Sequence, residues 1–465
     1  MTRTSSRPSI LALILLTTVL ASPSHGFAQA KEQVLYSFQG LPDGAQPVGE
    51  VVFDSTGNLY GATTEGGSSS CISVAQCGTV YELSPPTSQG GSWTETVLYI
   101  FKGNTFNDGT SPNGGLVMDS AGNLYGSTAY GGTGNCVLLG TLMGCGTVYE
   151  LSPPTQSGGA WSEKVIYSFP DAAHGYKPNG DLTLDRAGNL YGATEFGGGY
   201  GTSCDPYFQY CGAIFELIPP QQQGGAWTEQ VLYGFKGTAR GALAGDGGAP
   251  NGGLVLDRYR NIYGTTMAGG FTGGGCDGLS VGSAGCGTVF KLVPSHTKGE
   301  MWTEEILYRF NGIEGADPSA GVVFDESGDL CGSAFGGGTD GHGTLFRVAP
   351  PSQGSKVWVE STLYNFDGHS AGGPAASLIF DPTGNLYGTS SSATNTDARG
   401  TVFRIQRTDQ TFQIIHTFKT VPDGETPASP LLFATNGDLF GTTQAGGTGT
   451  TCGVGGCGTV FEVEP

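Results

Sequence analysis

Seven copies of one short motif run through the chain, and this repetition constrains the fold more than any other feature. The motif Asn58-Leu59-Tyr60-Gly61 returns with small changes at Asn123, Asn189, Asn261, Asp329, Asn385 and Asp438, at intervals of 53 to 72 residues. Self-similarity of this kind is the signature of repeat architectures, in which each copy is one supersecondary unit. The copies are therefore interpreted together and not as separate domains.

Each copy contains four short runs of β-branched and aromatic residues separated by Gly, Pro and Asn, which predict strands. In the first copy these strands, named A to D, are expected over 50–54, 58–64, 78–83 and 93–101. The chain also holds 82 glycines in 465 residues. An interior Gly costs a helix about 1 kcal/mol relative to Ala, whereas tight turns need the positive φ that Gly readily adopts. We therefore expect an all-β fold.

Four-stranded units repeated seven times predict a seven-bladed β-propeller. A solenoid would need capping repeats, and none is visible. Residues 34–38 form a strand D without its own A, B and C, while 458–463 form a strand C without its D. We expect residues 33–38 to complete the last blade, whose inner strands lie near 431, 439 and 460. This closure removes free sheet edges and makes one propeller domain of residues 31–465.

Two repeated features mark the turns. An Asp-x-x-Gly-Asn segment between strands A and B predicts a short hairpin, and it starts at Asp54, with further copies at Asp119, Asp185, Asp325 and Asp381. All five tryptophans occupy one repeat position between C and D, namely Trp93, Trp161, Trp227, Trp302 and Trp358. Because the repeat spreads them around a ring, we interpret them as packing residues and not as one ligand-stacking site.

The first 30 residues predict a secretory signal peptide. Arg3 and Arg7 precede an apolar run over 10–21, and Ala28-Gln29-Ala30 suits signal peptidase. We expect cleavage near Ala30, with a cut after Ala21 as the alternative. The apolar run is too short to cross a bilayer of ~30 Å as a helix, and the chain ends without a hydrophobic tail. We expect a secreted protein, extracellular or periplasmic, without a membrane span.

The mature chain is strongly acidic. Removing the leader takes away two of the 20 Lys and Arg residues and none of the 40 Asp and Glu residues, which leaves 18 against 40 and a net charge of −22. Such a field repels phosphate backbones and anionic membranes, so we expect no nucleic acid partner. Cations, neutral glycans and proteins stay open as ligands, and the protein is expected to be a monomer.

Cysteine usage agrees with export, because ten of the eleven cysteines form close pairs at one repeat position. Metal sites need four ligands with shorter spacings such as Cys-x-x-Cys, so we expect disulfides within each pair. Cys331 stands where other copies have Tyr and is expected to be a buried free thiol. The pairs are Cys71 and Cys77, Cys136 and Cys145, Cys204 and Cys211, Cys276 and Cys286, and Cys452 and Cys457.

The compound motif resembles a bacterial family. Copies of Gly-Leu-Val-x-Asp-x-x-Gly-Asn-Leu-Tyr-Gly-x-Thr-x-x-Gly-Gly followed by Gly-Thr-Val-Phe-Glu-Leu are similar to those of the secreted choice-of-anchor tandem repeat GloVer-containing proteins, and the resemblance covers essentially the whole mature chain. It implies the repeat fold. It implies no activity, cofactor or catalytic residue, because the family brings none.

The expected topology sorts the connections onto two faces. The A–B and C–D turns emerge on one face, here called the turn face, and the B–C loops and D–A connections emerge on the other, called the loop face. The B–C loops vary and carry all five cysteine pairs, while the A–B turns repeat almost unchanged. Because variable loops on a rigid scaffold commonly carry binding sites, we expect any ligand on the loop face near the ring axis, and no unique site on the turn face.

Two kinds of candidate site residue lie on the loop face. Acids that precede Gly in the D–A connections could hold Ca²⁺, which takes six to eight oxygen ligands, although Asp-Gly is also ordinary turn chemistry. These candidates are Asp43, Asp108, Asp246 and Asp423. The non-repeating histidines His174, His342 and His369 are the candidates for catalysis, but neither a nucleophile motif nor metal-ligand spacing accompanies them.

Two function classes follow. The first is a secreted binding or scaffold propeller for a glycan, cation or protein. The alternative is a propeller-type lyase or hydrolase with a His and acid site near the central channel. Three non-repeating polar groups within ~4 Å of one another in a concave pocket would favour the enzyme, and no cofactor other than Ca²⁺ is suggested.

Overall fold

A computed structural model describes residues 30–465, apart from 69–76, 89, 104–106, 139, 157, 199–210, 223, 238–244, 272–275, 277–284, 298, 353, 393–397 and 454. The predicted leader, Cys71 and Cys204 lie outside the described residues. None of the described residues is helical, and so the described part of the chain holds no helix that could cross a membrane.

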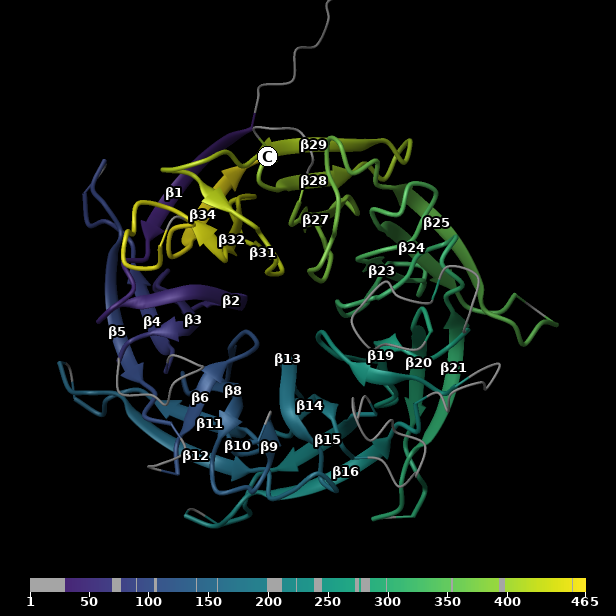
Figure 1. The fold of residues 1–465 in the computed structure, drawn as a ribbon, viewed down its shortest axis with the longest axis horizontal. Helices are drawn as coiled ribbons and strands as arrows, with labels where there is room; N and C mark the ends of the chain where they lie inside the picture. The colour runs from purple at the N-terminus through teal and green to yellow at the C-terminus, as the bar shows by residue number, and fades with distance from the viewer. Residues whose placement is uncertain are drawn as a thin grey trace, which may run out of the picture.

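The chain forms a seven-bladed β-propeller, as the repeat predicts (Figure 1). In each blade the hydrogen-bonded order is A-B-C-D, with A nearest the centre of the ring and D at the outside. Blade 1 contains β2 (Gly44–Phe53), β3 (Leu59–Gly66), β4 (Thr79–Ser84) and β5 (Thr94–Ile100). Blade 2 contains β6 (Gly109–Pro112) and β7 (Val117–Met118) as strand A, then β8 (Leu124–Gly131), β11 (Thr147–Ser152) and β12 (Ser162–Ser168), with a small hairpin of β9 (Val137–Leu138) and β10 (Thr141–Leu142). Blade 3 contains β13 (Tyr176–Leu184), β14 (Leu190–Phe196), β15 (Ala213–Ile218) and β16 (Thr228–Gly234).

The other blades follow the same order with shorter innermost strands. Blade 4 contains β17 (Gly248–Pro250) and β18 (Val255–Leu256), then β19 (Ile262–Ala268), β20 (Thr288–Val293) and β21 (Thr303–Arg309). Blade 5 contains β22 (Val323–Phe324), β23 (Leu330–Ala334), β24 (Thr344–Ala349) and β25 (Val359–Asn365). Blade 6 contains β26 (Ile379–Phe380), β27 (Leu386–Ser390), β28 (Thr401–Ile405) and β29 (Phe412–Thr417). Blade 7 contains β31 (Leu432–Phe433), β32 (Leu439–Thr443), β34 (Thr459–Glu464) and β1 (Lys31–Ser37), next to a short pair of β30 (Gly424–Glu425) and β33 (Ala445–Gly446).

The predicted ring closure is confirmed. Strand β1 pairs antiparallel with β34, with Lys31 opposite Glu464 and Ser37 opposite Thr459. The side chains of Leu35 and Phe38 are buried in one cluster with Val460. The first strand of the described chain therefore completes the last blade, and this pairing covers the outer edge of β34.

Strand A differs from the expected uniform run, because its first half is pinned to the neighbouring blade. In all seven blades the residue before the repeated proline has positive φ, from 50° at Ala249 to 60° at Gly373. Its N–H donates to the carbonyl that precedes strand C of the previous blade, as Gln46 does to Cys457 over 2.8 Å and Lys177 to Cys145 over 3.0 Å. This ring of seven hydrogen bonds joins blade to blade and explains why the proline recurs, since Pro needs no hydrogen-bond acceptor for its own nitrogen.

Glycine lets the innermost strands approach one another at the ring axis. A Cβ on Gly115 would clash with the backbone nitrogen of Glu50, and one on Gly180 would lie 2.6 Å from the carbonyl oxygen of Gly252. A larger residue at either position would push two blades apart. The axis is consequently a place where backbones and short side chains meet.

The hydrophobic core lies between neighbouring blades, where the aromatic repeat residues interlock. Trp161 of blade 2 packs on Tyr60 of blade 1 at 5.7 Å between ring centroids, and Trp227 of blade 3 packs on Tyr125 of blade 2 at 6.0 Å. The interpretation of the tryptophans as packing residues agrees with these contacts. Each blade is thus stabilised mainly by its neighbours.

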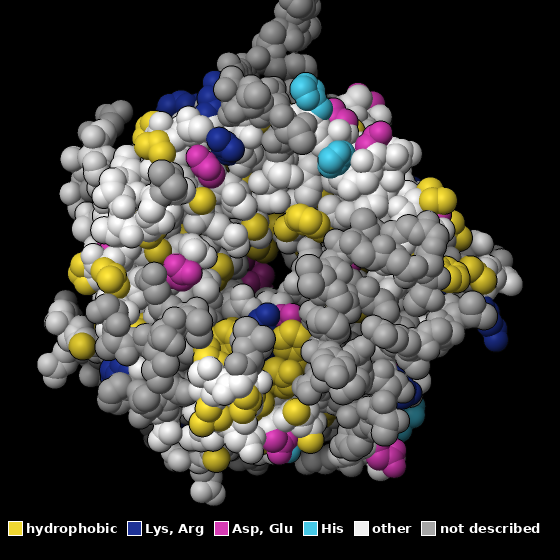
Figure 2. Space-filling view, viewed as in Figure 1, with side chains coloured by type: hydrophobic (Ala, Val, Ile, Leu, Met, Phe, Trp, Pro, Cys, Tyr) yellow, Lys and Arg dark blue, Asp and Glu magenta, His cyan; other side chains and the backbone are white. Residues whose placement is uncertain are grey.

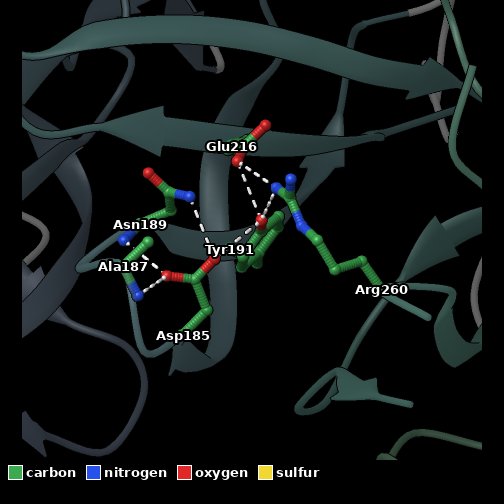
Figure 3. Close-up of polar contacts among 6 residues, drawn as sticks. All are labelled: Asp185, Ala187, Asn189, Tyr191, Glu216 and Arg260. Atoms are coloured by element: carbon green, nitrogen blue, oxygen red, sulfur yellow. Dashed lines mark hydrogen bonds and ion pairs between the residues drawn. The ribbon is translucent and has the colours of Figure 1, made fainter. Parts of the chain in front are cut away.

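The A–B turns form as the Asp-x-x-Gly-Asn motif predicts. In blade 3 the Asp185 carboxylate accepts the backbone N–H of Ala187 at 2.8 Å and the backbone and side-chain N–H groups of Asn189, each at 2.9 Å (Figure 3). The Tyr191 hydroxyl lies 2.8 Å from Glu216, which also pairs with Arg260 of the next blade at 2.8 Å. This network fixes the turn and ties it to blade 4, which is a structural role.

Candidate functional site

Contacts between connections confirm the two faces. On the turn face, Arg407 of a C–D turn donates its backbone N–H to Asn385 of an A–B turn over 3.0 Å. On the loop face, Gly132 after strand B donates to the carbonyl of Asp108 in a D–A connection over 2.8 Å. Each face is therefore built from the two kinds of connection assigned to it.

A channel of ≈ 230 Å³ runs at the ring axis and is lined in all seven blades mainly by strand A or by the residues that follow the repeated proline just before it. Its wall is asymmetric. Blades 2, 3 and 4 contribute the amides of Asn113, Asn179 and Asn251 at one repeat position, where the other blades have small or apolar residues. In Figure 2, acidic and basic side chains lie at the rim of the central hollow. The remaining lining at that repeat position consists of Val48, Ser319, Ala375 and Ala428.

A chain of hydrogen bonds leads from the channel wall toward the loop face. The Asn113 side-chain N–H donates to Asn179 Oδ1 over 2.6 Å, and Asn179 Nδ2 lies 3.4 Å from Glu195 Oε2. The same oxygen pairs with Lys177 Nζ at 2.6 Å, and this ammonium also lies 5.2 Å from the centre of the Phe196 ring. Lys177 and Glu195 have no counterpart in the other six repeats, so they make one sector of the seven-bladed ring unique.

Two carboxyl groups meet beside this chain. Asp181 of blade 3 accepts hydrogen bonds from the backbone N–H groups of Gly115 in blade 2 and Glu50 in blade 1. Burial, followed by the charge of Asp181, raises the pKa of the Glu50 carboxyl to about 8, and burial also raises the pKa of Asp181. Because the two N–H groups favour the ionised form of Asp181, we assign the charge to Asp181 and the proton to Glu50 at neutral pH.

The acids predicted for a cation site do not gather at the axis. Each caps its own D–A connection, as Asp43 does by accepting the N–H groups of Gln39 at 2.9 Å and Gly44 at 2.6 Å. Asp108, Asp246 and Asp423 accept backbone N–H groups in the same way. Among the described residues, the four carboxylates do not lie close enough to one another to hold one metal ion. Strand D is the outermost strand, so these acids lie at the periphery of the ring. Their role is that of ordinary Asp-Gly turn residues, which accept backbone N–H groups of their own connection.

These capping acids belong to a repeated outer triad. The tyrosine of strand D donates to the acid, as in Tyr36 to Asp43 at 2.9 Å and Tyr99 to Asp108 at 2.8 Å. A glutamate from the next blade's strand D lies beside them, and burial followed by the acid's charge raises the pKa of Glu95 and Glu163 to about 7. The same pKa is reached by Glu304 and Glu360, and blade 6 has Phe412 at this position, stacked on Tyr364 at 3.7 Å between ring centroids.

The three candidate histidines do not form a site together. His174 Nδ1 lies 2.8 Å from Asp171 in an exposed D–A connection. His342 and His369 are both exposed, and the His342 ring packs against Gly368, next to His369. Among the described residues no acid pairs with the side chain of His342 or His369. None of the three lines the channel.

The predicted disulfides form wherever both partners are described. Cys136 pairs with Cys145, Cys276 with Cys286, and Cys452 with Cys457. Cys77 and Cys211 are also disulfide-bonded. Cys331 is free and buried, as its place in the repeat predicts.

The turn face holds a pocket that does not repeat around the ring, contrary to the expectation that this face would offer no unique site. A cavity of ≈ 160 Å³ lies between blades 5 and 6, lined by Cys331, Arg347 and Arg407 among others. Between blades 1 and 2 and between blades 2 and 3 a Tyr of one blade packs on a Trp of the next, but here the repeat has Cys331 and Gln410 at these two positions. The pocket is the space that two missing rings leave.

Sequence reasoning missed the channel residues. Glu50, Asp181 and the three asparagines follow the repeated proline, and Lys177 precedes it. An alignment of the seven copies would have shown these departures, because Lys177 occurs once at its position and carboxyl groups occur at the Glu50 position in two copies only. The signal was present in the repeat but not in any recognised motif.

Residues 279–465 match the family described as the Gloeobacter/Verrucomicrobia repeat, which confirms the resemblance over that part of the chain. No curated protein matches the sequence. Similar solved structures include a polysaccharide lyase described as an ulvan lyase (10% identity, TM-score 0.49, 90% of each chain covered). A Bacteroides uniformis protein provisionally assigned as a 6-phosphogluconolactonase has 14% identity and TM-score 0.45 over 78% of this chain and 84% of that one. A carbohydrate-active enzyme of Trichoderma reesei has 13% identity and TM-score 0.39 over 94% and 96%. At these values the likenesses carry no argument about chemistry.

Proposed function

We propose that this protein is a secreted binding module that holds a neutral, hydroxyl-rich ligand, a glycan, in the loop-face end of its central channel. The observation that carries the proposal is the asymmetry of the channel wall, where Asn113, Asn179 and Asn251 face blades with short side chains. Amide groups both donate and accept hydrogen bonds, which suits sugar hydroxyls. A seven-fold symmetric wall would offer no such preferred side.

The size and charge of the channel favour this ligand class. At ≈ 230 Å³ the channel is smaller than the ~300–1,000 Å³ pockets that enclose drug-sized ligands, so it suits a single ring or a chain end. The Asn251 amide nitrogen lies 3.3 Å from the Met267 sulfur, a weak acceptor that a hydroxyl would improve on. The acidic chain would repel a polyanionic glycan, which directs the proposal to neutral sugars.

Glycan-array binding followed by calorimetry tests the proposal. The variant Asn251→Leu keeps the side-chain volume and removes the amide, so each lost hydrogen bond should weaken binding about tenfold. Arg258→Ala, an exposed change on the turn face, is the control and should bind like the wild type. Equal binding by Asn251→Leu and the wild type, with loss in Arg258→Ala, would mean that the site lies on the other face.

A second candidate function is hydrolysis or elimination on a bound glycan. The one observation that favours it is the pair of carboxyl groups of Glu50 and Asp181. Two carboxyl groups whose environments separate their protonation states can act as acid and base. Release of reducing ends or unsaturated products from a panel of neutral polysaccharides would support it, provided that Glu50→Gln abolishes the release. Binding without turnover would leave the module as a binder only.

A further inference from the structure

One of the seven outer triads departs from the repeat at its tyrosine position. In six blades strand D carries a tyrosine at this position, namely Tyr36, Tyr99, Tyr167, Tyr233, Tyr308 and Tyr364. In blade 6 the residue is His416, on β29, beside Asp423 of the following connection and Glu32 of β1. The one histidine therefore occurs at the junction where the N-terminal strand closes the ring.

The imidazole does not replace the tyrosine's hydrogen bond. His416 Nε2 lies 3.7 Å from Asp423 Oδ2, compared with 2.8 Å between Tyr99 and Asp108 in the ordinary triad. Among the described residues, His416 Nε2 is a buried atom without a hydrogen-bond partner, and so is Glu32 Oε1, as are the equivalent oxygens of Glu95, Glu163, Glu229 and Glu304. The unpaired imidazole nitrogen is thus what distinguishes this junction from the ordinary triads. Buried polar atoms are rarely left unpaired, so an additional group between the imidazole and Glu32 would satisfy both.

We propose that Glu32, His416 and Asp423 bind a divalent metal ion of the zinc class, which clamps the closing strand to blade 6. One ligand atom from each side chain lies within 4.8 Å of the other two. In a tetrahedral site with bonds of about 2.0–2.2 Å, ligand atoms stand roughly 3.3–3.6 Å apart. A small movement of side chains therefore converts the observed cluster into a coordination site.

The donor set selects the metal. Imidazole suits zinc, nickel and copper, whereas Ca²⁺ prefers six to eight oxygen ligands. Two carboxylates and a neutral imidazole would balance the charge of a divalent ion, which is favourable in a partly buried place. Three protein ligands leave one position for water.

The consequence is structural. Glu32 belongs to the first strand of the described chain, and His416 and Asp423 belong to the blade 6 side of the junction. Strand β1 is held by its pairing with β34, by the buried side chain of Leu35, and by an exposed ion pair of Lys31 with Glu464 at 3.2 Å, of which the ion pair contributes little. A metal bridge would add a bond across the junction that only the folded ring can form.

The repeat supplies its own control variants. His416→Tyr restores the residue of the other six blades and should fold normally, while Tyr99→His places an imidazole beside Asp108 and Glu163 and should create a second site. Untagged secreted protein, freed of metal by chelation, is titrated with Zn²⁺ and with Ca²⁺ by calorimetry, and its thermal midpoint is measured with and without Zn²⁺.

We expect one Zn²⁺ bound per wild-type chain, a raised thermal midpoint, and at least about tenfold weaker binding with no midpoint shift in His416→Tyr. A stoichiometry of two in Tyr99→His supports the site geometry. Absence of Zn²⁺ binding by the wild type, or unchanged binding by His416→Tyr, would overturn the proposal. Neither result bears on glycan binding in the channel, which is tested separately.

Discussion

The outer glutamates should make the stability of the protein fall as the pH rises, and replacing four of them should weaken this dependence. Glu95, Glu163, Glu304 and Glu360 have their pKa raised from 4.5 to about 7, first by burial. Between those pH values the folded protein holds protons that the unfolded chain has released. Raising the pH through this range therefore favours unfolding, while below 4.5 and above about 7 the two states carry the same protons on these groups.

The magnitude follows from the size of the pKa change. A rise of the pKa from 4.5 to about 7 would correspond to about 3 kcal/mol for a fully buried group. These glutamates are only half-buried, so solvent screening reduces the effect, and we expect about 1 kcal/mol for each. The four lie in different blades and share no hydrogen-bond partner, so their effects should add to about 4 kcal/mol.

The perturbation is the fourfold Glu→Gln variant, in which an uncharged amide replaces each of Glu95, Glu163, Glu304 and Glu360. Free energies of unfolding are measured in urea at pH 3.5 and pH 8. The variant should match the wild type at pH 3.5 and exceed it by about 4 kcal/mol at pH 8. The control Glu300→Gln changes an exposed glutamate and should leave the pH dependence unaltered. Parallel pH dependence in the wild type and the fourfold variant would refute the reasoning.

Three further predictions concern single side chains. Leu35→Ala in the closing strand removes a side chain that is 7% exposed and should lower the free energy of unfolding by about 2–5 kcal/mol. Leu41→Ala, at a side chain that is 44% exposed, is the control. Equal losses of stability in the two variants would argue against closure of the ring by β1. Tyr99→Phe deletes the hydroxyl that donates to Asp108 and should cost about 1.5–3 kcal/mol in urea unfolding; an effect within about 0.5 kcal/mol would mean that the triad adds no stability. Cys331→Tyr restores the repeat residue into a pocket of ≈ 160 Å³ and should raise the thermal midpoint; a lowered midpoint would show that the pocket does not accept the ring.

Much of the architecture is determined locally and could therefore be predicted from the sequence. The Asp54 to Asn58 turn closes through its own side chain, with Asn58 N–H donating to Asp54 over 2.9 Å, so five consecutive residues contain the whole interaction. The same holds for cysteines such as Cys452 and Cys457, which are five residues apart. Seven such local units, with a strand D at the start and a strand C at the end, leave closure of the ring as the arrangement that pairs every strand.

Contacts between blades were beyond the sequence, because the repeat does not say which side chain of one copy faces which side chain of the next. Glu50, Gly115 and Asp181 come from three blades, and only the approach of their backbones at the axis brings the two carboxyl groups together. Asp43 and Asp423 showed the converse, since their shared place in the repeat suggested convergence while their backbone hydrogen bonds hold them at the periphery. The sequence shows that His416 stands at a repeat position where the other six blades have Tyr. Its contact with Glu32 depends on ring closure, which brings together residues far apart in the sequence.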